Sequence, residues 1–180
     1  MSGTKRLYNL DEKNYFKFFG VEEKQGISIR SLSTHYKKIL NLLKDDTSFL
    51  GRDHKEFAHR AFNTLVDPIL RARYILETNG HEWDFRDGAT ADDLSFTHEL
   101  KAQLGRANLF FELENFIFEL KDHTHFIIEQ IEESLDVYEN YKSASGLVNR
   151  FYEISALHDE AVSKKHEVEE GIHHGAFDPH

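Results

Sequence analysis

The chain has no cysteine, and of its 180 residues only two are proline and ten are glycine. The absence of cysteine excludes disulfides, thiolate nucleophiles, cysteine-bound zinc and cysteine-held iron–sulfur clusters in this chain. So few prolines and glycines disfavour a β-sandwich, which needs frequent turns. No apolar run is long enough to cross a bilayer, and no apolar stretch typical of a secretory signal follows residues 1–6. We therefore expect a soluble intracellular protein.

The common sequence signatures of enzymes are also absent. The sequence contains no phosphate-binding GxxxxGK[ST] loop, no GxGxxG dinucleotide motif and no GxSxG nucleophile turn. Acidic residues are abundant, but nothing in their spacing marks a general acid paired with a general base. The sequence therefore predicts a protein that is not an enzyme.

Charge is distributed unevenly along the chain. Residues 1–80 contain 14 Lys or Arg and 10 Asp or Glu, whereas residues 81–180 contain 8 and 22. Two halves of different charge are typical of two surfaces with different partners, although acidic helices can also simply be well solvated. The acidic half would repel phosphates, so we expect no nucleic-acid partner.

Four helices are expected in residues 1–80, each bounded by residues that commonly start or stop helices. Apolar side chains at intervals of three and four mark their inner faces. The first helix covers residues 14–19 and stops at Gly20. The second starts at Ser28 or Ser31, and the third at Asp53. The fourth starts at Asp67-Pro68 and stops at Asn79-Gly80.

Three longer helices are expected after a linker at residues 81–91, with Leu109, Tyr138 and Val162 among the residues facing inward. The first is capped by Asp92 or Asp93 and extends to about residue 120, and the second covers 124–141. After a turn at 143–146, the third covers 147–171 and is followed by a frayed tail at 172–180. The predicted fold is all-α, with an N-terminal helical hairpin domain (1–80) followed by an acidic three-helix bundle (92–171).

Three segments of the sequence resemble one known family. Residues 14–20 read NYFKFFG, residues 61–76 read AFNTLVDPILRARYIL and are followed by Asn79-Gly80, and an acidic helical region begins near Asp92. In this order they resemble HscB, the J-domain co-chaperone family of iron–sulfur cluster assembly. The resemblance implies an L-shaped molecule in which a J-domain precedes a three-helix bundle.

The resemblance also implies a function and partners. A protein of this family would recruit an IscU-type scaffold, which carries the nascent cluster, to a DnaK/HscA-type heat-shock chaperone. It would hold no cofactor itself, in keeping with the lack of cysteine. Its compartment would be the cytoplasm in a bacterium and the mitochondrial or mitosomal matrix in a eukaryote.

The chain departs from the family at the loop after the second helix. There the family carries His-Pro-Asp, which engages the chaperone and promotes its ATP hydrolysis, but this sequence has Lys44, Asp45 and Asp46. With Lys37 and Lys38, these residues are the candidate chaperone-binding set. Alternatively, the lysines form only a solvated helix face. A further alternative is that the protein is an adaptor that binds a client without stimulating the chaperone.

Apolar residues supply the candidate scaffold-binding set. Phe96, Leu100 and Leu104 lie at i, i+4 and i+8 along one helical stripe, which the resemblance matches to the scaffold-binding face. Phe151 or Tyr152 of the last helix would lie opposite. The alternative is that these side chains form the bundle core, and for Leu104 the core reading is the stronger one.

The twelve histidines leave a third possibility, a histidine-dependent metal-binding helical protein. His123 and His125 lie close together, His173 and His174 are adjacent, and His180 is the last residue. No HExxH spacing organises them, and the His158-Asp159 pair lacks aligned further ligands of the kind that metal phosphohydrolases use.

Overall fold

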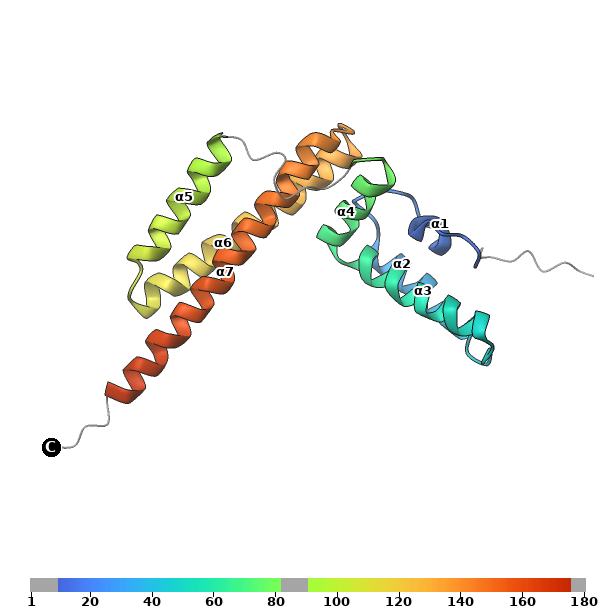
Figure 1. Cartoon of the computed structure of the whole chain (residues 1–180), viewed down its shortest axis with the longest axis horizontal. Coiled ribbons are helices and arrows are strands. Elements are labelled where there is room, and N and C mark those ends of the chain that lie inside the picture. Colours follow the sequence, from blue (N-terminus) through green and yellow to red (C-terminus); the bar gives the residue numbers. More distant parts are fainter. Residues whose placement is uncertain (1–9, 82–90, 176–180) are drawn as a thin grey trace, which may run out of the picture.

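The computed structural model describes residues 10–81 and 91–175, and these contain helices and no strand. The helices are α1 (Tyr15–Phe19), α2 (Ile29–Leu42), α3 (Phe49–Val66), α4 (Pro68–Thr78), α5 (Ala91–Arg106), α6 (Phe110–Asp136) and α7 (Tyr141–Gly175). The all-α prediction is confirmed. In Figure 1, α1–α4 form one arm and α5–α7 form a second, and the arms meet at an elbow beside α4. Within the described ranges, no helix could span a membrane.

Local signals define most helix ends of the first arm. The Asn14 side chain accepts a hydrogen bond from the Lys17 N–H (3.1 Å), and Gly20 ends α1 with φ 64°. Ser28 caps α2. Asp67 accepts hydrogen bonds from the first turn of α4, in which proline is the first helical residue. The stop at Gly20 and the start at Asp67-Pro68 are as the sequence predicted, and Ser28 is one of the two starts that it offered, because each depends only on neighbouring residues. Asn14 was expected to be the first residue of its helix and is the cap before it.

The start of α3 was predicted wrongly. The helix begins at Phe49, with Ser48 as its cap, and not at Asp53. The Ser48 hydroxyl oxygen accepts a hydrogen bond from the Gly51 N–H (3.0 Å). Serine is as good a cap as aspartate, and the first turn carries exposed apolar side chains that show no inward periodicity.

The bundle helices break at positions other than those expected. The chain is continuous in α6 through 121–123 and in α7 through 143–146, and the turns lie at 107–109 and 137–140. At the first turn, the Glu112 carboxylate accepts hydrogen bonds from the N–H groups of Asn108 (3.0 Å) and Leu109 (3.1 Å), which starts α6. These two hydrogen bonds lower the pKa of Glu112. At the second turn, Glu139 takes a left-handed conformation with φ 49°.

The outer limits of the bundle also differ from the prediction. The backbone of α5 is helical from Ala91, so Asp92 and Asp93 lie inside its first turn rather than before it. The last helix continues beyond Gly171 to Gly175. The expected linker, apart from His81 and Ala91, and the final part of the expected tail (176–180) lie outside the described residues.

Aromatic contacts fill the core of the first arm. Tyr15 stacks on Tyr74 with 4.3 Å between ring centroids, and Tyr36 stacks on Phe62 at 4.1 Å. Phe16, Phe18 and Phe19 of α1 are fully buried among the other helices. Each such side chain contributes roughly 1.5–3 kcal/mol through burial.

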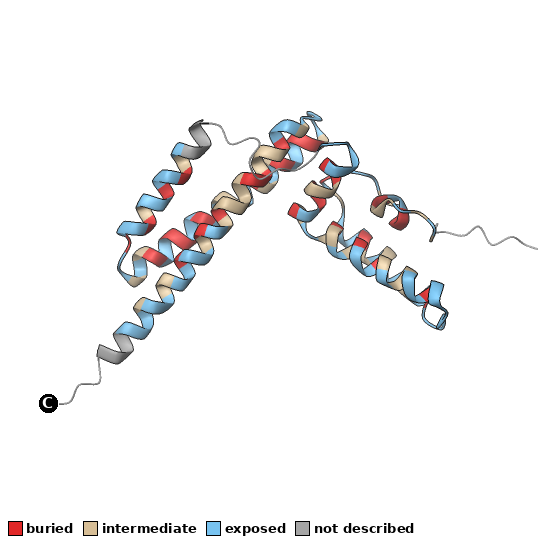
Figure 2. Ribbon diagram, viewed as in Figure 1, coloured by how far each residue is buried: buried red, intermediate tan, exposed pale blue. Residues whose placement is uncertain are grey.

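Aliphatic side chains dominate the core of the second arm, where buried positions follow the inner faces of the helices (Figure 2). Leu113, Leu120, Ile131, Ile154 and Leu157 have exposed fractions of 2% or less. Leu109, Tyr138 and Val162 were expected inside, but 52%, 66% and 44% of their side chains are exposed. The first two belong to the turns that end the helices, where helical periodicity no longer holds.

One carboxylate joins the two arms. Asp136, the last residue of α6, accepts hydrogen bonds from the backbone N–H groups of Gln25 and Gly26, both at 2.7 Å. The Gln25 side chain donates to the Pro68 carbonyl at 2.7 Å, so this loop is fixed to α4 as well. Buried Arg71 lies at the same joint, where desolvation lowers its pKa and the charges of Glu132, Asp67 and Asp136 oppose that effect.

Replacing Asp136 by alanine should lower the free energy of unfolding by about 1–3 kcal/mol, because two backbone donors lose their acceptor. Hydrogen exchange at the Gln25 and Gly26 amides should accelerate. Chemical denaturation and amide exchange measure the two effects. Asp122→Ala removes an exposed carboxylate from the same helix and is the control. Unchanged exchange at both amides would contradict the role given to Asp136.

Candidate functional site

The five candidate chaperone-binding residues all lie on or beside the far end of α2. Lys37 and Lys38 project from the helix, and Lys44, Asp45 and Asp46 lie in the loop to α3, all of them exposed. The structure thus brings the predicted set together at the end of the first arm, away from the elbow (Figure 1).

Hydrogen bonds within the loop fix its shape. An Asp46 carboxylate oxygen accepts from the Ser48 N–H (3.0 Å), and Lys55 Nζ donates to the Asp46 carbonyl (2.8 Å). Hydrogen bonds from the Ser48 side chain and backbone, with the charges of Lys55 and His54, lower the pKa of Asp46. A Cβ at Gly51 would collide with the Asp46 carboxyl group, so glycine allows this carboxylate to pack over α3. The loop is therefore ordered without the proline of the family motif, and its aspartate is already engaged.

The same end of the arm exposes large apolar side chains that the sequence analysis missed. The exposed fractions are 67% for Leu42, 80% for Phe49 and 58% for Leu50. The available signal was Phe49-Leu50 directly after a polar loop, where apolar residues have no core to enter. We call residues 42–50 the tip.

The candidate scaffold-binding stripe on α5 divides into buried and accessible parts. Leu100 and Leu104 are only 5% and 3% exposed and belong to the core, which corrects the expectation of an open patch. Their side of α5 is closed by α7, where Lys164 Nζ donates to the Leu104 carbonyl (2.9 Å). The i, i+4, i+8 stripe is the face that packs the bundle.

Phe96 remains partly accessible at the end of that stripe. The Arg150 guanidinium of α7 lies 4.3 Å from the centre of its ring, and the His123 ring of α6 meets it edge-on at 5.2 Å. Next to it, the Thr97 hydroxyl donates to Glu153 of α7 (2.7 Å). Phe96 thus lies where all three bundle helices meet, with a cation on one side.

The two aromatic residues of α7 lie in different surroundings. The Tyr152 hydroxyl accepts a hydrogen bond from Arg73 of α4 (3.4 Å), so this ring lies at the joint between the arms and not opposite Phe96. Phe151 meets Tyr152 edge-on at 6.0 Å and is partly buried against the core. Contacts between helices far apart in sequence decide both positions.

Histidines do not assemble a metal site in the part of the chain that the structure describes, where no group of three or more possible ligands occurs. His158 Nδ1 lies 3.4 Å from its neighbour Asp159, and His125 lies 3.6 Å from Glu129. The side chains of His173 and His174, and all of His180, lie outside the described residues.

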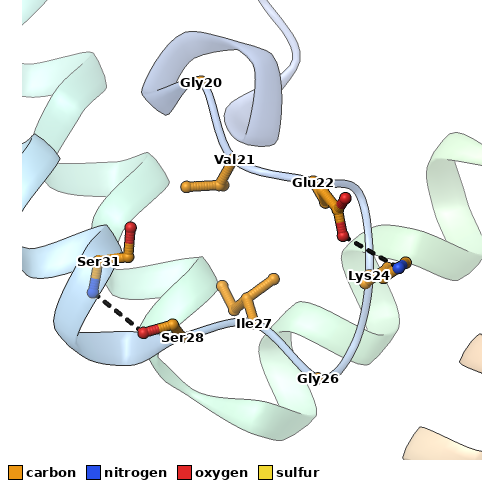
Figure 3. A pocket seen from close by; sticks show the side chains of 8 residues that line it. All are labelled: Gly20, Val21, Glu22, Lys24, Gly26, Ile27, Ser28 and Ser31. Atoms are coloured by element: carbon orange, nitrogen blue, oxygen red, sulfur yellow. Dashed lines mark hydrogen bonds and ion pairs between the residues drawn. The ribbon is translucent and has the colours of Figure 1, made fainter.

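A shallow pocket lies under the loop between α1 and α2, lined by residues between Gly20 and Ser31 (Figure 3). Two of its charged groups, Glu22 and Lys24, pair with each other at 3.0 Å. The Ser28 hydroxyl caps α2 by accepting from the Ser31 N–H (3.2 Å). These polar groups already serve the local structure, and we assign no ligand to the pocket.

Comparison with known proteins supports the resemblance at the level of fold. No protein-family model and no curated protein matches the chain. Among solved structures, the chaperone HscB from Vibrio cholerae matches with a TM-score of 0.70 and 20% identity, over 86% of this chain and 99% of that one. The human co-chaperone HscB matches with a TM-score of 0.76 and 15% identity, over 91% and 92% of the two chains. The chain therefore has the fold of the HscB co-chaperones, over nearly their whole length.

Proposed function

We propose that the protein is an HscB-type co-chaperone, which brings an IscU-type scaffold protein to a DnaK/HscA-type chaperone during iron–sulfur cluster assembly. The observation that carries the proposal is the shared two-arm fold, which covers 99% and 92% of two HscB chains. The motif-level resemblance at residues 14–20 and 61–76 supports it independently.

The tip and the lysines of α2 are the proposed chaperone-binding surface. Lys37, Lys38 and Lys44 would attract an acidic surface and speed association. The Asp46 carboxylate is already hydrogen-bonded to the Ser48 N–H. The exposed Phe49 ring and Leu50 side chain would therefore supply contact area for the chaperone in its place.

The surface around Phe96 is the proposed scaffold-binding site. It combines an accessible part of an aromatic ring with the Arg150 guanidinium that covers it, and Phe151 lies one residue further along α7. A few such residues can supply most of the binding energy of an interface. Leu100 and Leu104 would act only by supporting the ring from inside.

A second candidate function follows from the loop sequence. Lys44, Asp45 and Asp46 replace His-Pro-Asp, and the one remaining aspartate is turned toward α3. Such a protein could tether scaffold to chaperone and raise their effective concentration without promoting ATP hydrolysis.

A single-turnover ATPase assay of the cognate chaperone, with and without scaffold, tests the proposal. We expect stimulation by the native chain, and a loss of roughly fivefold or more in Lys37→Glu/Lys38→Glu, because charge reversal would repel an acidic surface. The matched control is Lys101→Glu/Lys142→Glu, which changes the net charge equally on exposed lysines of the bundle. Chaperone binding without stimulation would favour the adaptor. If the chain neither binds the chaperone nor stimulates its ATPase, both candidate functions are wrong.

Phe96→Ala should weaken scaffold binding by about 1–3 kcal/mol, because an aromatic residue at the centre of an interface contributes that much. Isothermal titration calorimetry measures the change, and circular dichroism verifies folding. Phe126→Ala removes a ring that is 59% exposed on α6 and is the control. Unchanged affinity of the folded Phe96→Ala variant would show that the scaffold does not bind at Phe96.

A further inference from the structure

Three phenylalanines lie exposed along α6, and neither proposed surface uses them. The exposed fractions are 58% for Phe111, 65% for Phe118 and 59% for Phe126. Single exposed apolar residues are normal, but rings repeated along one helix are the pattern of a binding face. We call these three residues the aromatic face.

Helical geometry places the aromatic face on the side of α6 away from the core. Phe111 and Phe118 are seven residues apart and point almost the same way, and Phe126 lies about 80° around from Phe118 at 100° per residue. Leu113, Leu120 and Ile131 point the opposite way and are fully buried. From Phe111 to Phe126 the face is about 22 Å long at a rise of 1.5 Å per residue. Phe111 and Phe118 belong to the half of α6 remote from the elbow, and Phe126 lies just past the middle of the helix (Figure 1).

The charged side chains of α6 itself are almost entirely acidic. Residues 110–136 contain eight Asp or Glu and one Lys. Asp122 lies four residues from both Phe118 and Phe126 on the same side, and Glu119 and Glu129 are exposed nearby. Some of these acids already have partners: Glu114 pairs with Lys165 of α7 (3.1 Å), Glu119 accepts from the Gln103 side chain of α5 (3.2 Å), and Glu129 lies 3.6 Å from His125.

We propose that the aromatic face docks an amphipathic helix of a partner protein, with apolar side chains at intervals of three, four and seven and with Lys or Arg beside them. The length of the face matches three turns or more of a helix, and interdigitating apolar side chains would cover the rings. The flanking cations would meet Asp122, Glu119 and Glu129. This partner is distinct from the chaperone and the scaffold, which are proposed to bind elsewhere.

Charge argues against two other possible occupants, a second copy of the chain and the tail at 176–180. A second copy would bring two acidic α6 helices together, and like charges across an interface cost several kcal/mol. Residues 176–180 contain an aspartate and no Lys or Arg, so they do not complement the face.

The test uses a designed helical peptide of three heptads, with leucine at its apolar positions and lysine beside them, and titrates it into the full chain. We expect saturable binding, amide shift changes confined to α6 and its neighbours, and much weaker binding of a version with glutamate in place of lysine. Phe111→Ser/Phe118→Ser should weaken binding by roughly tenfold or more. Asp122→Lys should weaken it about threefold to tenfold and flatten its salt dependence.

The control is Phe49→Ser/Leu50→Ser, which removes exposed apolar groups from the tip and should leave peptide binding unchanged. Equal binding of both peptides, or full binding to Phe111→Ser/Phe118→Ser, would overturn the proposal. The proposal would also be overturned if the chain self-associates and Phe111→Ser/Phe118→Ser abolishes that association, since the occupant would then be a second copy. Tighter peptide binding after deletion of 176–180 would make the tail the occupant. None of these outcomes depends on the chaperone assay.

Discussion

The Asp136 carboxylate holds the two arms of the molecule together. A carboxylate at the end of a helix opposes the helix dipole and is unfavourable on its own. Here two backbone N–H groups from the loop at Gln25 and Gly26, each 2.7 Å away, offset that cost. Around this contact lie the buried Arg71, the hydrogen bond from Arg73 to Tyr152, and the stacking of His81 on Tyr141 at 4.5 Å between centroids. The elbow is therefore a polar joint built from both arms.

A fixed elbow has consequences for the proposed function. The tip lies at the free end of the first arm, and Phe96 lies in the second, so the joint determines how far apart the two proposed partners are held. Linking two binding surfaces raises effective concentration only when the geometry lets both be occupied together. The aromatic face points away from the core of the second arm.

Sequence reasoning succeeded where the physics is local. The stop at Gly20 and the start at Asp67-Pro68 each depend on a few neighbouring residues, and both were predicted. Periodicity showed that Leu100 and Leu104 lie on one face, but not whether that face meets water or α7. The same limit hid the exposure of Phe111 and Phe118. Tyr152 and Asp136 were beyond reach, since their partners Arg73 and Gln25 are 79 and 111 residues away.

The most direct test of the fixed elbow is the distribution of distances between the two arms in solution. Because the chain has no cysteine, Thr47→Cys and Ser163→Cys introduce unique positions for spin labels, both on exposed residues. Pulsed electron spin resonance should give one narrow distribution in the otherwise native chain. A broad or multiple distribution would show that the arms move independently, and would contradict an account in which Asp136 sets the spacing of the binding surfaces.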